Sequence, residues 1–127
     1  VGYSLNKPKP KKEGDPRVYR RGEDIELTLY YRVLKRVASG KKIFIHIDTR
    51  GNRIQDDHEP LEGDFPTNHW LPGDVIKDVT KLNIGSYAQR GTYTIHTGLF
   101  QGSKRMKVEP KKAGSADRLI LRKIEIR

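Results

Sequence analysis

The sequence predicts an all-β protein, an antiparallel β-sandwich of about seven strands, and two patterns carry this prediction. Apolar and polar residues alternate at period two along several segments, as in strands that turn one face to a core. Turns that contain Gly or Pro separate these segments at short intervals, and no segment shows the spacing of an amphipathic helix. A length of 127 residues suits one domain around a single core.

The first two strands of this domain are the most regular. The inward side chains of the first strand are expected to be Ile25, Leu27, Leu29, Tyr31 and Val33. A second strand is predicted over 42–49, with three isoleucines on its inward face. Phe44, His46 and Asp48 lie on the outward face of that strand. The polar residues 56–68 are then expected to cross from one sheet to the other.

The later strands begin after turns. Their expected inward side chains are Val75, Val79, Leu82 and Ile84, then Tyr93, Ile95, Thr97 and Leu99, and finally Leu119, Leu121, Ile124 and Ile126. The first of these sets is irregular and suggests a bulge. The last set changes phase between Leu121 and Ile124, which predicts another bulge. A short strand is expected over 105–108.

Residues 1–15 are predicted to be a flexible, basic leader, and residues 16–127 to be the folded domain. Lysines and prolines dominate the leader, which offers little apolar surface to bury. The leader and the loop 104–112 carry much of the net charge of +10 at pH 7. This charge favours anionic partners, such as nucleic acid or acidic glycans. The alternative is that both segments are solvated linkers.

The composition excludes several classes of protein. The chain has no Cys, so it holds neither a disulfide scaffold nor a thiolate metal site. No apolar run approaches the ~20 residues of a membrane-spanning helix. The sequence has no Gly-rich phosphate loop and no Ser nucleophile elbow, so we expect a protein that is not an enzyme and that needs no cofactor. It opens at Val1 without a signal-peptide pattern, which suggests a mature product or a piece of a longer protein.

Four residues are predicted to hold the turns and the ends of the core. Pro72 fixes one dihedral of a turn and Gly73 accepts a positive φ, while the Trp70 indole covers the end of the core. A ligand-stacking role is the alternative for Trp70. Tyr93 is expected to bury its ring and to bond a nearby backbone group through its hydroxyl, as in a tyrosine corner.

A longer motif resembles a known family. It reads Asp57-x-Glu59-Pro60-x-x-Gly63-x-x-Pro66-Thr67-x-x-Trp70-x-Pro72-Gly73-Asp74-Val75-Ile76-x-Asp78, followed by Gly91-x-Tyr93-x-Ile95-x-x-Gly98-Leu99-Phe100. The pattern is similar to the small immunoglobulin-like sandwich appended to some bacterial membrane glycosyltransferases and other envelope proteins, and it spans roughly Tyr19 to Ile126. The resemblance implies an immunoglobulin- or fibronectin-III-like fold and an extracytoplasmic position, periplasmic or at the cell surface. It also implies contact with a partner protein or a neighbouring domain, and it carries over no catalytic residue.

Two outward histidines form a candidate metal site. His46 and His96 belong to strands that are neighbours in an immunoglobulin-like sandwich, and Asp48 lies two residues beyond His46. Two imidazoles and a carboxylate on an exposed face suit a divalent metal ion. The alternative is an ordinary set of solvated polar residues. Residues 56–59 are an acidic cluster that is open to the same two interpretations.

Outward aromatic and basic residues form a candidate binding surface. Its members are Tyr30, Arg32, Phe44, His96 and Phe100. Flat rings flanked by basic groups can stack sugar rings or contact an apolar partner. The alternative is that a neighbouring domain covers this face.

Three functions follow from these observations. The preferred one is a non-catalytic immunoglobulin-like interaction or accessory module of a larger bacterial envelope protein. The second is carbohydrate binding, to a neutral or acidic glycan, through the exposed aromatic and basic residues. The third is binding of nucleic acid or another polyanion, which ranks last because aromatic residues are scarce among the Lys and Arg clusters.

Overall fold

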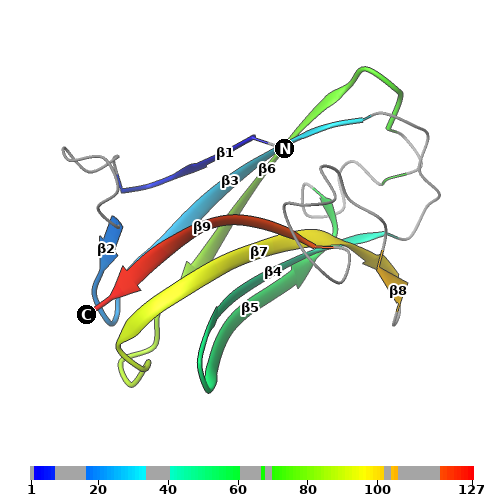
Figure 1. The fold of residues 1–127 in the computed structure, drawn as a ribbon. Helices are drawn as coiled ribbons and strands as arrows, with labels where there is room; N and C mark the ends of the chain where they lie inside the picture. Colours follow the sequence, from blue (N-terminus) through cyan, green and yellow to red (C-terminus); the bar gives the residue numbers. More distant parts are fainter. Residues whose placement is uncertain are drawn as a thin grey trace.

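The structure is a computed structural model, and it describes residues 2–7, 17–33, 41–60, 67, 70–101, 104–105 and 118–127. These residues form two β-sheets that lie face to face, and they contain no α-helix (Figure 1). The all-β class is therefore confirmed. The described ranges hold nine strands, where about seven were expected. The strands Gly2–Leu5, Arg17–Tyr19 and Asn52–His58 were not among those predicted.

Sheet A has three strands and sheet B has six. Sheet A is ordered β1 (Gly2–Leu5), β3 (Asp24–Arg32) and β6 (Val75–Asn83). Sheet B is ordered β2 (Arg17–Tyr19), β9 (Leu119–Ile126), β7 (Gly91–Gln101), β4 (Lys42–Thr49) and β5 (Asn52–His58), and β8 (Lys104–Arg105) pairs with the end of β7. Neighbouring strands run antiparallel, except that β2 is parallel to β9.

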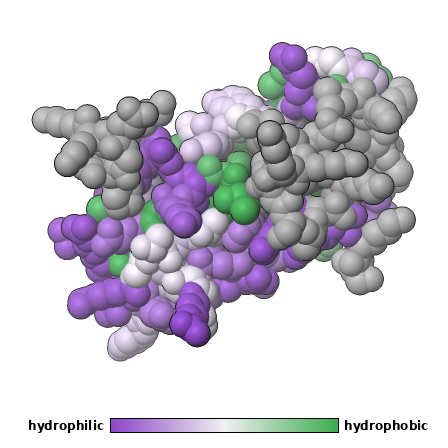
Figure 2. Space-filling model, viewed as in Figure 1, coloured by the Kyte–Doolittle hydropathy of each residue, from purple (hydrophilic) through white to green (hydrophobic). Residues whose placement is uncertain are grey.

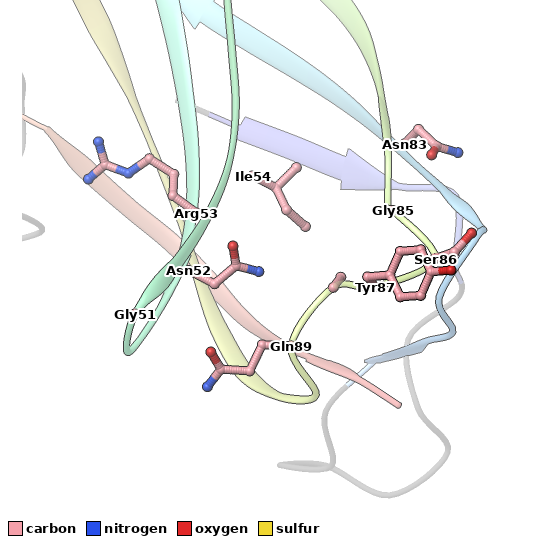
Figure 3. Close-up of a pocket in the computed structure, with 10 residues that line it drawn as sticks. Gly51, Asn52, Arg53, Ile54, Asn83, Gly85, Ser86, Tyr87 and Gln89 are labelled. Atoms are coloured by element: carbon pink, nitrogen blue, oxygen red, sulfur yellow. The ribbon is translucent and has the colours of Figure 1, made fainter.

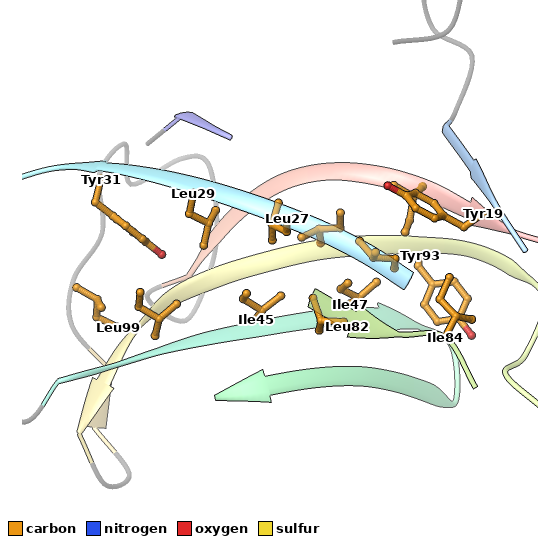
Figure 4. Packing of buried hydrophobic residues seen from close by; sticks show 14 of the residues in the cluster. Tyr19, Leu27, Leu29, Tyr31, Ile45, Ile47, Leu82, Ile84, Tyr93 and Leu99 are labelled. Atoms are coloured by element: carbon orange, nitrogen blue, oxygen red, sulfur yellow. The ribbon is translucent and has the colours of Figure 1, made fainter. Parts of the chain in front are cut away.

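The core lies between the sheets and is built from alternate side chains of the facing strands, which Figure 4 shows pointing toward one another. The inward residues predicted for β3 and β4 are all buried: Ile25, Leu27, Leu29, Tyr31, Val33, Ile43, Ile45 and Ile47. Thr97 of β7 is also buried, and its hydroxyl donates to the Phe44 carbonyl at 2.9 Å. The Tyr31 hydroxyl bonds the Thr97 hydroxyl at 2.9 Å, so these inward polar groups are paired.

Strand β6 differs from the prediction. Val75 and Val79 are exposed, and the buried positions are Ile76, Asp78, Thr80 and Leu82. The pairing with β3 runs without a register shift, so the bulge expected here is wrong. β6 is a regular strand, but two of its inward residues, Asp78 and Thr80, are polar. The apolar residues alone therefore suggested an irregular strand.

Strand β5 covers residues that were expected to lie in a crossing loop. It continues through Asp56, Asp57 and His58 and pairs with β4 along its whole length. Its seven residues are nearly all polar, which hid the strand from a search for apolar alternation. The crossing itself is confirmed, because β5 belongs to sheet B and the next strand, β6, belongs to sheet A.

The end of the chain matches the prediction more closely. The pairing of β7 with β9 passes from Ile95–Arg122 to His96–Ile120 and skips Leu121, so the second bulge is confirmed. Of the short strand expected over 105–108, Arg105 belongs to β8, and residues 106–108 lie outside the described residues.

The first residues of the chain belong to the fold, so a leader over 1–15 that lies outside the domain is wrong for residues 2–7. β1 pairs with β3, and Tyr3 and Leu5 pack against the core. The Asn6 side-chain oxygen, Oδ1, accepts from the Tyr19 hydroxyl at 2.7 Å and from the Glu26 backbone amide at 3.2 Å. The alternation in β1 is only four residues long, and the Lys/Pro run beside it concealed the strand. Residues 8–16 lie outside the described residues.

The turn before β6 has the predicted chemistry. The Asp74 amide donates to the Leu71 carbonyl at 2.9 Å, and Gly73 has a φ of 94°, a left-handed value that Gly adopts without a Cβ clash. Trp70, which precedes this turn, is buried in the core, with its ring centroid 6.2 Å from that of Tyr31. The predicted burial of Trp70 is confirmed.

The tyrosine corner is also present. Tyr93 is fully buried, and its hydroxyl donates to the Gln89 carbonyl, four residues upstream, at 2.6 Å. The same hydroxyl accepts from the Asn52 side-chain amide at 2.9 Å. One phenol therefore ties β7 to the start of β5 and to the loop between β6 and β7.

Asn6→Ala is expected to lower the free energy of unfolding by about 2 kcal/mol, because the buried Tyr19 hydroxyl loses its acceptor. Urea denaturation measures this change. Ser4→Ala is the matched control, since Ser4 is exposed on the neighbouring strand β1, and it is expected to be neutral. Equal stability of Asn6→Ala and the parent chain would contradict the packing of residues 2–7.

Trp70→Ala is expected to destabilise the protein by ~3 kcal/mol, the usual cost of truncating a buried large aromatic side chain. Leu71→Ala, one residue along and largely exposed, is expected to have little effect on the melting temperature. A Trp70→Ala protein with unchanged thermal stability would mean that this indole does not close the core.

Candidate functional site

The predicted histidine pair lies on the outer face of sheet B. His46 of β4 and His96 of β7 are direct cross-strand partners, and Asp48 follows on the same face of β4. The predicted side-by-side arrangement of the two imidazoles is therefore confirmed. The His96 Nδ1 atom lies 3.7 Å from Asp48 Oδ2, beyond hydrogen-bond distance.

This face is buried where the sequence predicted exposure. Only 8% of His46, 6% of His96 and 2% of Phe44 is accessible, so these groups do not meet solvent freely. The centroid of the Phe44 ring lies 4.8 Å from that of the His46 ring and 6.1 Å from that of the Phe100 ring. The Arg105 guanidinium lies over the Phe44 ring, 4.6 Å from its centroid. Alternation gives the direction of a side chain, but it does not reveal that rings and guanidinium groups pack over the outer face.

The two histidines and Asp48 do not form a metal centre. Among the described residues, no group of three or more His, Cys, Asp or Glu side chains is arranged to hold a metal ion. Asp48 is engaged instead by arginine: Arg53 donates to its two oxygens at 2.6 and 3.1 Å, and Arg118 lies 4.0 Å away. The Nδ1 atoms of both histidines are buried without a hydrogen-bond partner.

Burial and positive neighbours keep these imidazoles neutral. Burial lowers the pKa of His46, and the charge of Arg53 lowers it further. Burial lowers the pKa of His96 as well, with Arg118 as the next cause. The cluster is therefore a packed, neutral pair of imidazoles beside an Arg–Asp ion pair.

The predicted ligand surface is split between the two sheets. Tyr30 and Arg32 are on the outer face of β3 in sheet A, whereas Phe44, His96 and Phe100 are on sheet B. These five residues therefore cannot form one platform. Alternation separates inward from outward positions, but it does not show which of the two outer faces an outward residue occupies.

A histidine bridge that the sequence did not predict joins the two sheets. His58 at the end of β5 places Nδ1 2.6 Å from Asp56 Oδ2 and Nε2 2.6 Å from Asp78 Oδ2. Asp78 lies on β6 and is 1% exposed, and the Thr80 hydroxyl donates to its Oδ2 at 3.2 Å. Asp56 and His58 belong to the acidic cluster noted in the sequence, and in the structure their side chains bond each other.

The geometry of the bridge favours the imidazolium form. A neutral imidazole has a single N–H, so only the protonated ring can donate to both carboxylates. Burial alone would lower the pKa of His58, but the hydrogen bonds and charges of Asp78 and Asp56 outweigh it and raise the pKa above its ordinary value. Asp78, a polar residue at an inward position of β6, was the one sequence signal for this bridge.

An open cleft of about 600 Å³ lies at one end of the molecule. It is lined by residues 51–54 from the β4–β5 turn and the start of β5, and by Asn83 and residues 85–89 from the β6–β7 loop. Figure 1 shows both connections at the same end, and Figure 3 shows Asn52 and Ile54 directed toward the loop that carries Tyr87 and Gln89. We call this the end cleft; none of its residues was predicted as a binding residue.

Neither a protein-family model nor a curated protein matches the chain. No helix in the described ranges is long and apolar enough to cross a membrane.

His58 is expected to make the stability of the protein depend on pH. Because its folded-state pKa is raised, its contribution is complete below the unfolded value of about 6.5 and is lost as pH rises through the folded pKa. Urea denaturation between about pH 6 and pH 9 should show the free energy of unfolding falling in the parent chain more than in His58→Gln.

His46→Gln is the matched control for this experiment. The lowered pKa of His46 gives the opposite trend, with stability lost as pH falls below about 6.5, so this variant should keep the parent's slope at higher pH. Identical slopes for the parent and His58→Gln above neutral pH would contradict a charged bridge.

Proposed function

We propose that this protein is a non-catalytic immunoglobulin-like interaction module of a larger bacterial envelope protein, positioned outside the cytoplasmic membrane. The strand order supports the immunoglobulin-like part of this proposal. β1 and β2 correspond to a first strand divided between the sheets, and the order β1-β3-β6 against β9-β7-β4-β5 corresponds to strands A-B-E against G-F-C-C′. The tyrosine corner at Tyr93 is a second feature of such sandwiches.

The observation that carries the interaction role is the exposed outer face of sheet A. Val75 is 58% exposed and Val79 49%, while the corresponding face of sheet B packs its rings away from solvent. The register places Tyr30 opposite Lys77 and Arg32 opposite Val75, so aliphatic, aromatic and cationic groups alternate on one flat surface. Apolar contact area with a cationic rim suits a protein surface that carries acidic residues.

Among the coloured residues of Figure 2, hydrophilic ones cover most of the visible face, and hydrophobic ones reach the surface in small areas. A limited apolar surface is typical of an interface between folded units, where a few buried contacts supply most of the binding energy. The partner is therefore a folded acidic protein surface, against which Val75 and Val79 become buried.

Photo-cross-linking tests this function. A benzophenone amino acid replaces Val79 on sheet A or Ile120 on sheet B, two aliphatic residues with closely matched exposure of 49% and 47%. In cells that make the protein, Val79 should give a discrete cross-linked protein product and Ile120 should not. Lys77→Glu, which reverses the charge beside Val79, should reduce the yield.

Two results would overturn this function. One is the absence of a cross-linked product at Val79, and the other is an equal yield from both positions. Thermal unfolding of each variant, carried out beforehand, confirms that both carry the probe on a folded protein.

A further inference from the structure

We propose that the end cleft binds a neutral saccharide, with the Tyr87 ring as its stacking surface. This inference rests on the proposed non-catalytic binding role, but it uses a different surface of the molecule. It also moves carbohydrate binding from the sheet residues suggested by the sequence to the loops at one end of the fold. Four properties of the cleft carry the argument.

The first property is an exposed aromatic ring on a loop whose backbone is held by hydrogen bonds. Tyr87 is 98% exposed, so the ring is free for a ligand. It sits in a turn closed by the Ala88 amide, which donates to the Gly85 carbonyl at 3.1 Å. Arg21 Nε donates to the Ala88 carbonyl at 2.7 Å and holds the same loop. A tyrosine ring offers a flat apolar face and a polar tip, the combination that packs against the C–H face of a sugar ring and bonds its hydroxyls.

The second property is the polarity of the lining. Asn52, Gln89 and Ser86 supply two amides and a hydroxyl, which both donate and accept hydrogen bonds as sugar hydroxyls do. The Asn52 Nδ2 atom donates to the Tyr93 hydroxyl, which leaves Oδ1 to accept from a ligand, and Figure 3 shows the Asn52 side chain directed toward the β6–β7 loop. Ile54 and Ala88 add apolar surface between these groups.

The third property is the absence of an available charge among the lining residues. No carboxylate belongs to the lining, and the single guanidinium, that of Arg53, is bonded to both oxygens of Asp48. Figure 3 shows the Arg53 side chain directed away from the β6–β7 loop. The cleft therefore favours an uncharged ligand over a phosphate, a nucleotide or an acidic sugar.

The fourth property is a suitable size, with the two sides of the cleft tied together through one buried side chain. The Tyr93 hydroxyl accepts from Asn52 on one rim and donates to the Gln89 carbonyl on the other, so a single buried group sets the width of the cleft. Its volume of about 600 Å³ lies within the ~300–1,000 Å³ range of small-molecule sites. A second hollow of about 300 Å³ shares Gly51, Asn52 and Arg53 with it. Its one carboxylate, that of Asp48, is bonded to Arg53, so a neutral glycan chain can continue across the β4–β5 turn.

The test is an NMR titration of the 127-residue chain with neutral oligosaccharides: glucans with α and β linkages, a mannan fragment and an N-acetylglucosamine oligomer. Each is added up to about 10 mM, which detects affinities in the millimolar class. At least one should shift the backbone amides of Asn52 and of residues 86–89. Tyr87→Ala should weaken its binding about tenfold, whereas Tyr87→Phe, which keeps the ring, should retain most of it.

Tyr30→Ala, on the outer face of sheet A and outside the cleft, is the matched control and should leave the affinity for the saccharide unchanged. Because Tyr87 is exposed, Tyr87→Ala should keep the parent's melting temperature, so lost binding is not lost folding. The inference is overturned if no saccharide binds, if the shifts map elsewhere, or if Tyr87→Ala binds as the parent does. These outcomes are independent of the cross-linking at Val79, so the two proposals fail separately.

Discussion

A carboxylate enclosed between the two sheets is the constraint on which much of this structure depends. Asp78 points inward from a regular strand of sheet A, where a charge without a partner would be strongly unfavourable. His58 supplies that partner from sheet B, and Asp56 shares it from the other side. The bridge joins β5 and β6, the strands at the edges of their sheets. A buried ion pair of this kind specifies which edges meet, whether or not it adds net stability.

The two outer faces differ in what they leave for a partner. On sheet B the rings of Phe44 and the two facing histidines are packed, and arginine occupies Asp48, so the polar groups there serve the fold. On sheet A the valines of β6 remain in water beside lysines. The loops at one end form a third kind of surface, concave and uncharged. Position in the fold, more than residue type, decides which of these groups are available for binding.

Periodicity predicted the parts of the fold in which apolar residues mark the inward face. The core of β3 and β4 and the bulge in β9 belong to this group, whereas the buried Trp70 and the corner at Tyr93 were predicted from the turn residues beside them. The parts that sequence could not predict are those in which polar residues occupy structural positions. β5 is almost wholly polar, and β6 places Asp78 and Thr80 inward, so neither follows the expected pattern. The end cleft was missed because it joins residues 51–54 to residues 83–89, which only the tertiary structure brings together.

The parallel pairing of β2 with β9 has a consequence for how the protein is made. Residues 17–19 pair with residues 124–126, about 100 positions later in the chain, and β9 also lies between β2 and β7. The six-stranded sheet therefore cannot assemble in order during synthesis, since its second strand is the last to emerge from the ribosome. Until then β2 has no neighbour and β7 has one open edge, the form in which β-proteins are most prone to wrong pairing. The nascent chain must remain shielded or uncommitted until Leu119–Ile126 becomes available, so closure of the sandwich is a late step in the folding of this domain.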